Sequence, residues 1–274
     1  MPESSDRTYL RTEQYRDAGN LTARIQLHER FSTNQYGWHR WVFDQFELSP
    51  QARILELGCG SGRLWAENQE RLPVRWEVIL SDFSPGMVEE ARQTVHAAPR
   101  LDFLVGDAEA IPFPEETFDA VVANFMLHHV PDRGKALSEI HRVLRSGGRV
   151  FAATNGQAHM RELGDLLRQV DPEAPRWKPS EGFTLENGPP QMEHWFADLS
   201  VRRYDDALLV TEAEPLIAYV LSGRTQTWLV GERRYRFAHQ IKAALARRGA
   251  IRITKDAGMI IGVGASGHPG TSSS

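Results

Sequence analysis

Short apolar runs alternate with helical patterns over the middle of the chain, and Gly, Pro, Ser and Asp separate them. The expected strands cover residues 52–57, 76–80, 101–105, 118–123 and 149–154. The expected helices between them cover residues 62–71, 84–95 and 133–144. This alternation predicts an α/β fold with a doubly wound, mostly parallel sheet and helices on both faces.

The segments on either side of this alternation are less regular. Helical patterns cover residues 20–31, 36–46, 158–170, 191–199, 211–221 and 231–248. Strand-like patterns cover residues 200–209 and 251–263. We therefore expect an N-terminal helical lid over residues 1–48 and a core over residues 49–265. The core would carry a small cap insertion at about residues 155–230, and the Gly/Ser-rich tail 266–274 would be disordered.

The composition is that of an ordinary globular protein, because 41% of the 274 residues are hydrophobic and 25% are charged. The formal net charge of −4 gives no support for binding nucleic acid or an anionic membrane. Cys59 is the single cysteine, which excludes an intramolecular disulfide and the metal motifs that need two cysteines. No run of about 18 apolar residues and no apolar leader segment occurs in the sequence. We therefore expect a cytoplasmic protein with no metal ion, nucleic-acid partner or membrane partner.

A glycine-rich stretch over residues 54–64 joins the first expected strand to the following helix. Gly58, Gly60 and Gly62 alternate with other residues, so the backbone can adopt positive φ and no Cβ keeps a ligand away. The spacing differs from the G-x-G-x-x-G of dinucleotide binders, and the Gly-Lys-Ser/Thr of a P-loop does not follow. The stretch therefore predicts a ligand cradle of another kind.

Two acidic residues follow the next two expected strands. Asp82 comes after the second strand, where it is placed to accept both hydroxyl groups of a ribose. Asp107 comes after the third strand and precedes Ala108, so its carboxylate can accept from the exocyclic amine of an adenine. Asp82 and Asp107 together therefore favour a ligand that contains a nucleoside.

Blocks of sequence in a fixed order resemble the class I S-adenosylmethionine-dependent methyltransferases. The blocks are Glu56–Gly62, Asp82–Ser84, Gly106–Ala108, Phe118–Val122, Leu127–Asp132 and Leu144–Arg149. The last two are similar to the small-molecule branch that includes the ubiquinone and menaquinone biosynthesis methyltransferases. The resemblance covers residues 50–155. It implies a seven-stranded Rossmann-like sheet, S-adenosylmethionine as the cofactor and a small molecule as the methyl acceptor. The aromatic-rich N-terminal segment suggests a partly apolar acceptor, as in specialised metabolism.

The resemblance also implies which residues hold the cofactor. The glycines would pack against its methionine part, Glu56 would orient the turn and Asp82 would hold the ribose. Phe83 and Met87 would flank the adenine, and a wall near the sulfonium would come from the end of the fourth strand. The implied cofactor-binding residues are Tyr15, Glu56, Gly58, Gly60, Gly62, Asp82, Phe83, Met87, Asp107, Ala108, Asn124, Phe125 and Met126.

Methyl transfer is an in-line displacement for which a protein mainly supplies proximity and alignment, worth roughly 7–11 kcal/mol. We expect an oxygen or nitrogen acceptor ahead of a carbon acceptor. An oxygen or nitrogen acceptor can also need a base, which contributes about 10²–10⁴-fold to the rate. His128 and His129 follow the fourth strand and are the candidate catalytic bases. In the alternative interpretation they are structural, since a Leu-His-His-Val run is common in this family whatever the substrate.

Four further residues are candidates for contact with the acceptor. Tyr36, Trp38 and His39 precede the core in an aromatic segment where such enzymes often carry a lid. His159 follows the fifth strand, where substrate pockets are usually completed. In the alternative interpretation these side chains pack a helix onto the sheet or lie on the surface.

Two other functions remain open. A non-catalytic protein could keep the cofactor pocket and serve as a scaffold or partner. A nucleic-acid or protein methyltransferase is disfavoured by the acidic net charge, and residues 124–127 read Asn-Phe-Met-Leu instead of the Asn/Asp-Pro-Pro-aromatic motif used on bases. The basic helix expected over residues 231–248 is better interpreted as a solvated surface than as a nucleic-acid patch.

Overall fold

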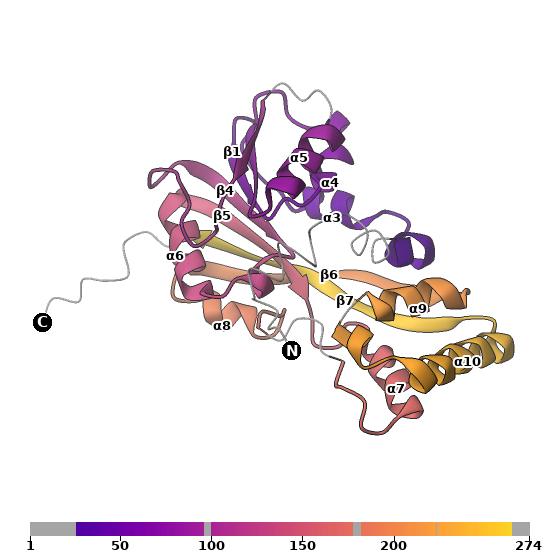
Figure 1. Ribbon diagram of the computed structural model, residues 1–274. Coiled ribbons are helices and arrows are strands. Elements are labelled where there is room, and N and C mark those ends of the chain that lie inside the picture. Colours follow the sequence, from indigo (N-terminus) through magenta and orange to yellow (C-terminus); the bar gives the residue numbers. More distant parts are fainter. Residues whose placement is uncertain (1–25, 96–99, 178–181, 223, 265–274) are drawn as a thin grey trace, which may run out of the picture.

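The computed structural model describes residues 26–95, 100–177, 182–222 and 224–264. Its centre is a seven-stranded sheet with the strand order β3-β2-β1-β4-β5-β7-β6 (Figure 1). Strands β1 to β5 run parallel, whereas β7 is antiparallel to both β5 and β6. The predicted doubly wound, mostly parallel sheet is confirmed.

The strands are β1 (Arg53–Leu57), β2 (Glu77–Asp82), β3 (Leu101–Val105), β4 (Phe118–Asn124), β5 (Leu144–Asn155), β6 (Phe196–Val210) and β7 (Ile251–Gly264). The helices are α3 (Trp38–Asp44), α4 (Arg63–Ala66), α5 (Pro85–Thr94), α6 (Arg133–Val143), α7 (Arg161–Val170), α8 (Gly188–Met192), α9 (Ala213–Leu221) and α10 (Gly231–Arg248). Short 3-10 turns are η2 (Gln69–Arg71), η3 (Leu127–His129) and η4 (Arg224–Thr227), and residues 26–31 are also helical.

Successive strand residues point to opposite faces of the sheet, so each strand feeds two hydrophobic clusters. On one face, Leu55 and Val121 pack in a cluster that includes Ile140 of α6. On the other face, Ile54 and Val122 pack in a cluster that includes side chains of α3, α4 and α5. The sheet is therefore buried on both faces, as its apolar strands predict.

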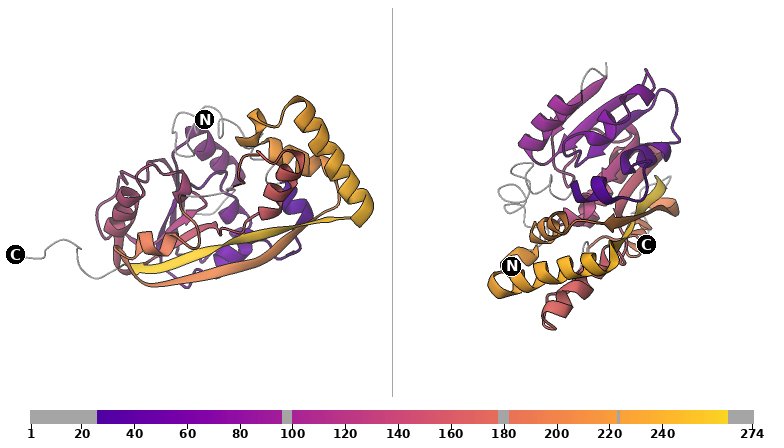
Figure 2. Two further views of the ribbon diagram at one scale, coloured as in Figure 1. Left: turned by 90° about the horizontal axis from the view of Figure 1, so that it is seen from below. Right: turned by 90° about the vertical axis from the view of Figure 1, so that its right-hand side faces the viewer.

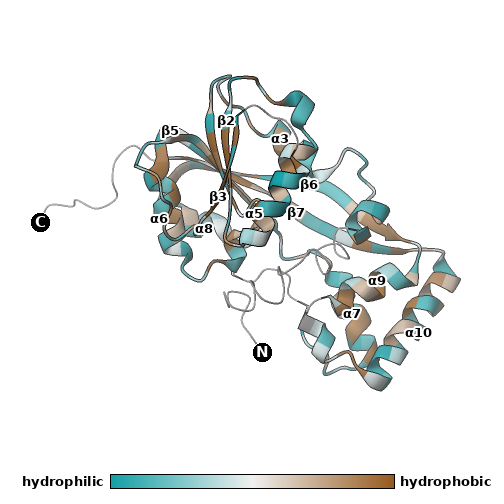
Figure 3. Ribbon diagram, turned by 45° about the horizontal axis from the view of Figure 1, so that its top comes forward, coloured by the Kyte–Doolittle hydropathy of each residue, from teal (hydrophilic) through white to brown (hydrophobic). Residues whose placement is uncertain are grey.

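A third hydrophobic cluster lies at the far end of the antiparallel pair of strands β6 and β7. This pair extends beyond the other strands, and α7, α9 and α10 surround its end (Figures 1 and 2). Phe237 and Ile241 of α10 pack there with Leu163 of α7, Leu216 of α9 and Ile253 of β7. Figure 3 shows hydrophobic stretches on both α7 and α9. We call α7, α9 and α10 the helical layer.

The segment 155–230 contributes to the sheet as well as to the helices. It includes β6, an edge strand of the main sheet, while the helical layer also takes in α10. The helix expected over residues 191–199 is wrong, because α8 ends at Met192 and β6 begins at Phe196. Pairing of Phe196 with Gly264 of β7 sets that strand start, and this long-range contact is not visible in local sequence.

The expected helix over residues 62–71 is shorter than predicted, since α4 ends at Ala66 and the η2 turn follows. The start of α5 is as expected, because the Ser84 side chain accepts a hydrogen bond from the backbone N–H of Met87 at 3.4 Å. Tyr15, the rest of residues 1–25 and the tail from residue 265 lie outside the described residues, so the predictions placed on them stay predictions. Among the described helices, none is long and apolar enough to cross a bilayer.

Candidate functional site

A cavity of about 270 Å³ lies at the carboxyl ends of β1, β2, β3 and β4. Strand order reverses between β1 and β4, and ligands of open α/β sheets bind at such a switch point. The cavity is lined by Leu57, Gly58, Gly60, Ser81, Asp82, Phe83, Ser84, Met87, Gly106, Asp107, Ala108, Glu109, Asn124, Phe125, Met126, His129, Val130 and Pro131.

The glycine turn after β1 forms one wall of the cavity. Gly58, Gly60 and Gly62 all have positive φ, at 67°, 53° and 77°. A Cβ on Gly58 would lie 2.6 Å from the Cβ of Met126, so this position excludes any side chain. At Gly60 no described atom lies within 4 Å of where a Cβ would be, so bare backbone faces open space.

Gly62 lies away from the cavity, contrary to the expected contact with the cofactor. It precedes the first residue of α4, and a Cβ there would come within 2.8 Å of Val95 and 3.2 Å of Ala91. Gly62 therefore allows α4 and α5 to approach each other, which is a packing role.

Asp82 ties the end of β2 to the glycine turn. One carboxylate oxygen accepts from the backbone N–H of Gly60 at 3.0 Å, and the other accepts from that of Ser84 at 2.8 Å. Burial raises the pKa of Asp82, although these backbone donors and that of Phe83 lower it. Each carboxylate oxygen has two lone pairs, so acceptor capacity is left for a bound ligand.

Glu56 lies behind the turn and does not line the cavity. It is 1% exposed, and one carboxyl oxygen accepts from the indole N–H of Trp65 in α4 at 2.6 Å. Burial, with a smaller contribution from the charge of Asp82, raises the pKa of Glu56 to about 8 against the opposing effect of the Trp65 hydrogen bond. This arrangement holds the end of β1 against α4, in line with the expected orienting role.

The loop after β3 closes another side of the cavity. Asp107 accepts from the backbone N–H of Glu109 at 2.9 Å, and Ala108 is buried beside it. Glu109 in turn accepts from the backbone N–H of Asp132 at 3.1 Å, just before α6. The loop that carries Asp107 is thereby fixed to the start of the next helix.

The end of β4 forms the wall opposite the glycine turn. Phe125 has φ of 56°, which is uncommon for a residue with a side chain and recurs at functional sites. Trp38 of α3 packs its ring 4.9 Å from that of Phe125 and donates its indole N–H to Oδ1 of Asn124 at 3.3 Å. The structure thus places Trp38 at the edge of the cavity, behind two residues that line it.

The two candidate bases differ in position. His129 lines the cavity, whereas His128 does not, although their rings are only 4.1 Å apart. The η3 turn explains the difference, because the backbone N–H of His129 donates to the carbonyl of Met126 at 2.9 Å. Of the pair, His129 is the one that a ligand in the cavity can reach.

Tyr36 and His39 do not line the cavity. Tyr36 is 48% exposed and donates its hydroxyl to Asp44 at 2.5 Å. His39 lies 3.0 Å from the carboxylate of Glu67, at the end of α4. Both side chains are turned to neighbouring helices, because α3 presents only one face to the sheet.

His159 is buried outside the cavity. It is 6% exposed, and its ring lies 6.1 Å from that of His28. Burial and the charge of Lys255 lower the pKa of His159 to about 3, against a hydrogen bond to the backbone of Asp256. The imidazole is therefore neutral at physiological pH.

Sequence reasoning did not single out several residues of the cavity. Glu109 directly follows the predicted Ala108, while Ser84, Val130 and Pro131 stand in blocks that carry the family resemblance, so their neighbours were the available signal. Ser81 carried no chemical signal of its own. Among the described residues, no group of three His, Cys, Asp or Glu side chains is arranged to hold a metal ion.

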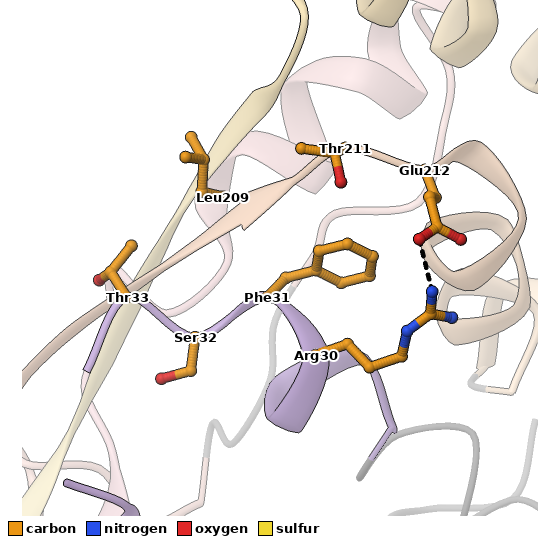
Figure 4. A pocket seen from close by; sticks show the side chains of 7 residues that line it. All are labelled: Arg30, Phe31, Ser32, Thr33, Leu209, Thr211 and Glu212. Atoms are coloured by element: carbon orange, nitrogen blue, oxygen red, sulfur yellow. Dashed lines mark hydrogen bonds and ion pairs between the residues drawn. The ribbon is translucent and has the colours of Figure 1, made fainter. Parts of the chain in front are cut away.

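A second hollow, of about 590 Å³, lies where residues 30–33 meet the end of β6 (Figure 4). Its lining contains an ion pair of 2.5 Å between Arg30 and Glu212, with Phe31 beside it. This hollow is an open surface groove at the end of β6, and its lining has no counterpart of the glycine turn, Asp82 and Asp107 that line the cavity.

The part of the chain that forms the cavity matches a known protein family. Residues 55–152 match the family described as a methyltransferase domain. A demethylmenaquinone methyltransferase of Symbiobacterium thermophilum is 37% identical over 115 residues, which are 41% of this chain and 46% of the relative. A malonyl-[acyl-carrier protein] O-methyltransferase of Serratia marcescens is 35% identical over 127 residues, 45% of this chain and 46% of the relative. The chain thus spans about half the length of the curated relatives it matches.

Among solved structures, a phosphoethanolamine N-methyltransferase of Haemonchus contortus in complex with S-adenosyl-L-methionine has the same fold. The TM-score is 0.59 at 20% identity, with 97% of this chain and 61% of that chain covered. The predicted resemblance to the class I methyltransferases, and their seven-stranded fold, are confirmed.

Proposed function

We propose, from the methyltransferase domain that residues 55–152 form, that this chain transfers a methyl group from S-adenosylmethionine to a small-molecule acceptor. The observation that carries the proposal is the cavity at the switch point of the sheet, where the glycine turn and Asp82 are joined by a hydrogen bond of 3.0 Å. This combination provides a bare backbone surface beside a carboxylate, which suits the amino-acid and ribose parts of one ligand.

The residues of the cavity suit this cofactor. Gly58 and Gly60 would lie along the methionine part, and the space beside the missing Cβ of Gly60 supports this placement. Asp82 has the lone pairs to accept ribose hydroxyls, and Phe83 and Met87 would flank the adenine. Asp107 and Ala108 would meet the adenine edge, while the contact proposed for Tyr15 stays a prediction. When bound, S-adenosylmethionine supplies a methyl group on a positively charged sulfur.

The chain would contribute alignment and exclusion of water. Asn124, Phe125 and Met126 form a rigid wall, because β4 is a central strand and Phe125 donates its backbone N–H to Ala153 at 3.0 Å. Holding two reactants against such a wall can be worth roughly 7–11 kcal/mol. His129 would accept a proton from the acceptor, which its place in the cavity lining supports, whereas His128 lies outside the cavity.

The acceptor is proposed to be a small organic molecule bound beside this wall. The relatives named above include a demethylmenaquinone methyltransferase and an O-methyltransferase that acts on a malonyl group of an acyl-carrier protein. The name of the second relative supports an oxygen acceptor, in line with the initial expectation of an oxygen or nitrogen acceptor ahead of a carbon acceptor. In the alternative function, a non-catalytic scaffold, the chain would bind the cofactor but would not transfer its methyl group.

Calorimetry tests the cofactor assignment. We expect S-adenosylmethionine to bind the wild-type chain, and Asp82→Asn to weaken binding at least about tenfold, since hydrogen bonds to a charged group are worth about 1.5–3 kcal/mol. The matched control is Asp102→Asn, an equal change of charge at an exposed position on β3. Absence of binding by the wild type, or equal affinity of both variants, contradicts the proposal.

Turnover tests the proposed base. With an acceptor identified by screening with methyl-labelled cofactor, His129→Gln is expected to lower turnover about 10²–10⁴-fold. His128→Gln is the control, because it changes the neighbouring ring outside the cavity. Near-normal turnover of both variants would leave alignment alone as the mechanism, and absence of any labelled product would favour the scaffold alternative.

A further inference from the structure

The side-chain amide of Asn124 has a fixed orientation at the cavity. Asn124 ends β4, pairs with Ala153 of β5 and lines the cavity. Its Oδ1 accepts from the indole N–H of Trp38 at 3.3 Å. An indole N–H only donates, so the atom turned toward α3 is the amide oxygen. The NH₂ group of the same amide donates to no other group among the described residues.

The Trp38 indole is itself held in place. Its ring lies 4.9 Å from Phe125, 5.2 Å from Trp41 and 5.4 Å from Tyr204 of β6. Turning the Asn124 amide over would place its NH₂ group against the indole N–H, donor against donor. The aromatic contacts keep the indole from moving aside, so the amide keeps its oxygen toward α3 and its NH₂ group turned away from the indole.

We infer that Asn124 is a specificity-determining residue, which selects acceptors that carry an oxygen able to accept a hydrogen bond and disfavours amines. A phenol, enolate or carboxylate oxygen beside Asn124 would receive the amide N–H. A neutral amine nitrogen offers a single lone pair, and its own N–H donors then face the amide N–H donors of Asn124 without an acceptor, which costs about tenfold in affinity. Trp38 acts as a positioning residue in this arrangement.

This inference rests on the proposed function, because it concerns the part of the cavity where the acceptor would lie. It sharpens the expectation for two residues. Trp38 holds Asn124 instead of touching the acceptor, and Asn124 turns its donors toward the acceptor as well as forming the wall beside the cofactor. It also favours oxygen-bearing acceptors over the nitrogen acceptors that the sequence left open.

Binding of two isosteric probes to the full chain tests the inference. Calorimetry would measure 2-naphthol, which carries an oxygen, and 2-naphthylamine, which carries an amine, with the protein saturated by S-adenosylhomocysteine. The wild type is expected to bind 2-naphthol about tenfold more tightly or better. Equal binding, tighter binding of the amine, or binding of neither probe overturns the inference.

Variants identify the residues responsible. Asn124→Asp replaces the NH₂ group by an oxygen and is expected to reverse the preference. Trp38→Phe removes the indole N–H while keeping an aromatic ring in the cluster, frees the amide to turn, and is expected to bring the affinity ratio close to one. Trp41→Phe is the matched control, since Trp41 contacts Trp38 and Tyr204 in the same cluster, and should keep the wild-type ratio.

The cofactor supplies the second measurement. The affinity for S-adenosylhomocysteine should stay within about twofold of the wild type in Trp38→Phe and Trp41→Phe, and a large loss in Trp38→Phe would show that the indole supports the cofactor site instead of setting the preference between acceptors. Failure of the wild type to bind S-adenosylhomocysteine contradicts the proposed function. Normal binding without a preference between the probes contradicts this inference alone.

Discussion

At the residue scale, two carboxyl groups near the glycine turn have different environments. Asp82 faces the cavity and accepts from two backbone N–H groups, which stabilise its charge. Glu56 is enclosed behind the turn with the Trp65 indole as its partner, and its pKa is raised to about 8. Only Asp82 is therefore placed to meet a ligand, while Glu56 carries its proton near neutral pH.

The raised pKa of Glu56 predicts a pH-dependent stability. A glutamate in the unfolded chain has a pKa of 4.5, whereas Glu56 in the folded chain has a pKa of about 8. Between these two pH values the folded state holds the proton and the unfolded state does not. The resulting stabilisation is complete below the lower value and is lost as the pH rises through the higher one, by about 1.4 kcal/mol per pH unit. Glu56→Gln should flatten this decline.

Urea unfolding between pH 5 and pH 8 measures the effect. Glu70→Gln, at an exposed position in η2, is the control and should keep the wild-type slope. A wild-type free energy of unfolding that does not fall more steeply with pH than that of Glu56→Gln contradicts the prediction.

The sequence alone predicts the location of residues that come directly after a strand of the sheet. Asp82, Asp107 and Gly60 line the cavity as expected, because parallel strands bring their carboxyl ends to one edge. Tyr36 and His39 were expected near the acceptor but turn to other helices. The direction of a side chain on a short helix depends on how that helix packs, and this is decided by contacts with distant segments.

At the element scale, β6 anchors the connection between helix 26–31 and α3. The Asp206 side chain is fully buried and accepts from the Ser32 hydroxyl at 2.7 Å and from the backbone N–H groups of Thr33 and Asn34 at 3.0 and 3.1 Å. Lys255 of β7 lies 2.5 Å from the same carboxylate. The position of α3, and of the indole at its start, therefore depends on one carboxylate in an edge strand.

Removal of this charge should loosen the connection. Asp206→Asn leaves the Lys255 ammonium, whose side chain is 11% exposed, without its counter-ion, and breaking a buried pair in this way costs about 3–5 kcal/mol. The free energy of unfolding in urea should fall by that order, and limited proteolysis should cut faster near residues 32–37. Asp205→Asn, at the exposed neighbouring position, is the control. Equal stability of the two variants contradicts this prediction.

Elements were predictable where their pattern is local. The 18-residue helix α10 has the expected bounds and buries Phe237 and Ile241 as its spacing indicates. The first residues of β6 fall in the expected helix 191–199, because their pairing with β7 depends on residues more than fifty positions further along the chain. A period-two pattern is recognisable only from residue 200, after the register shift between Ala197 and Ser200.

At the scale of the whole molecule, the cavity and the helical layer belong to different parts of the hydrophobic interior. Residues of β1 and β4 pack in the first two clusters, whereas α7, α9 and α10 pack in the third. The paired strands β6 and β7 run through both parts (Figure 2). Damage to the third cluster should therefore lower stability more than it affects ligand binding.

Phe237→Ala tests this separation. Phe237 is fully buried, and its truncation should lower the free energy of unfolding by about 3–5 kcal/mol while the affinity for S-adenosylhomocysteine changes little. Hydrogen exchange should accelerate in the helical layer before it does in β1 and β4. Tyr235→Ala, at a position 68% exposed on the same helix, is the control. An affinity that falls in step with stability contradicts the separation.

The place of β7 between β5 and β6 has a consequence for synthesis on the ribosome. The glycine turn, Asp82 and the wall at β4 are all translated before residue 132, but β5 finds its second neighbour only when residues 251–264 emerge. Until then the nascent chain carries an open strand edge, which can pair with other chains. The ligand site is thus encoded early, and the closure of the sheet that carries it waits for the last strand.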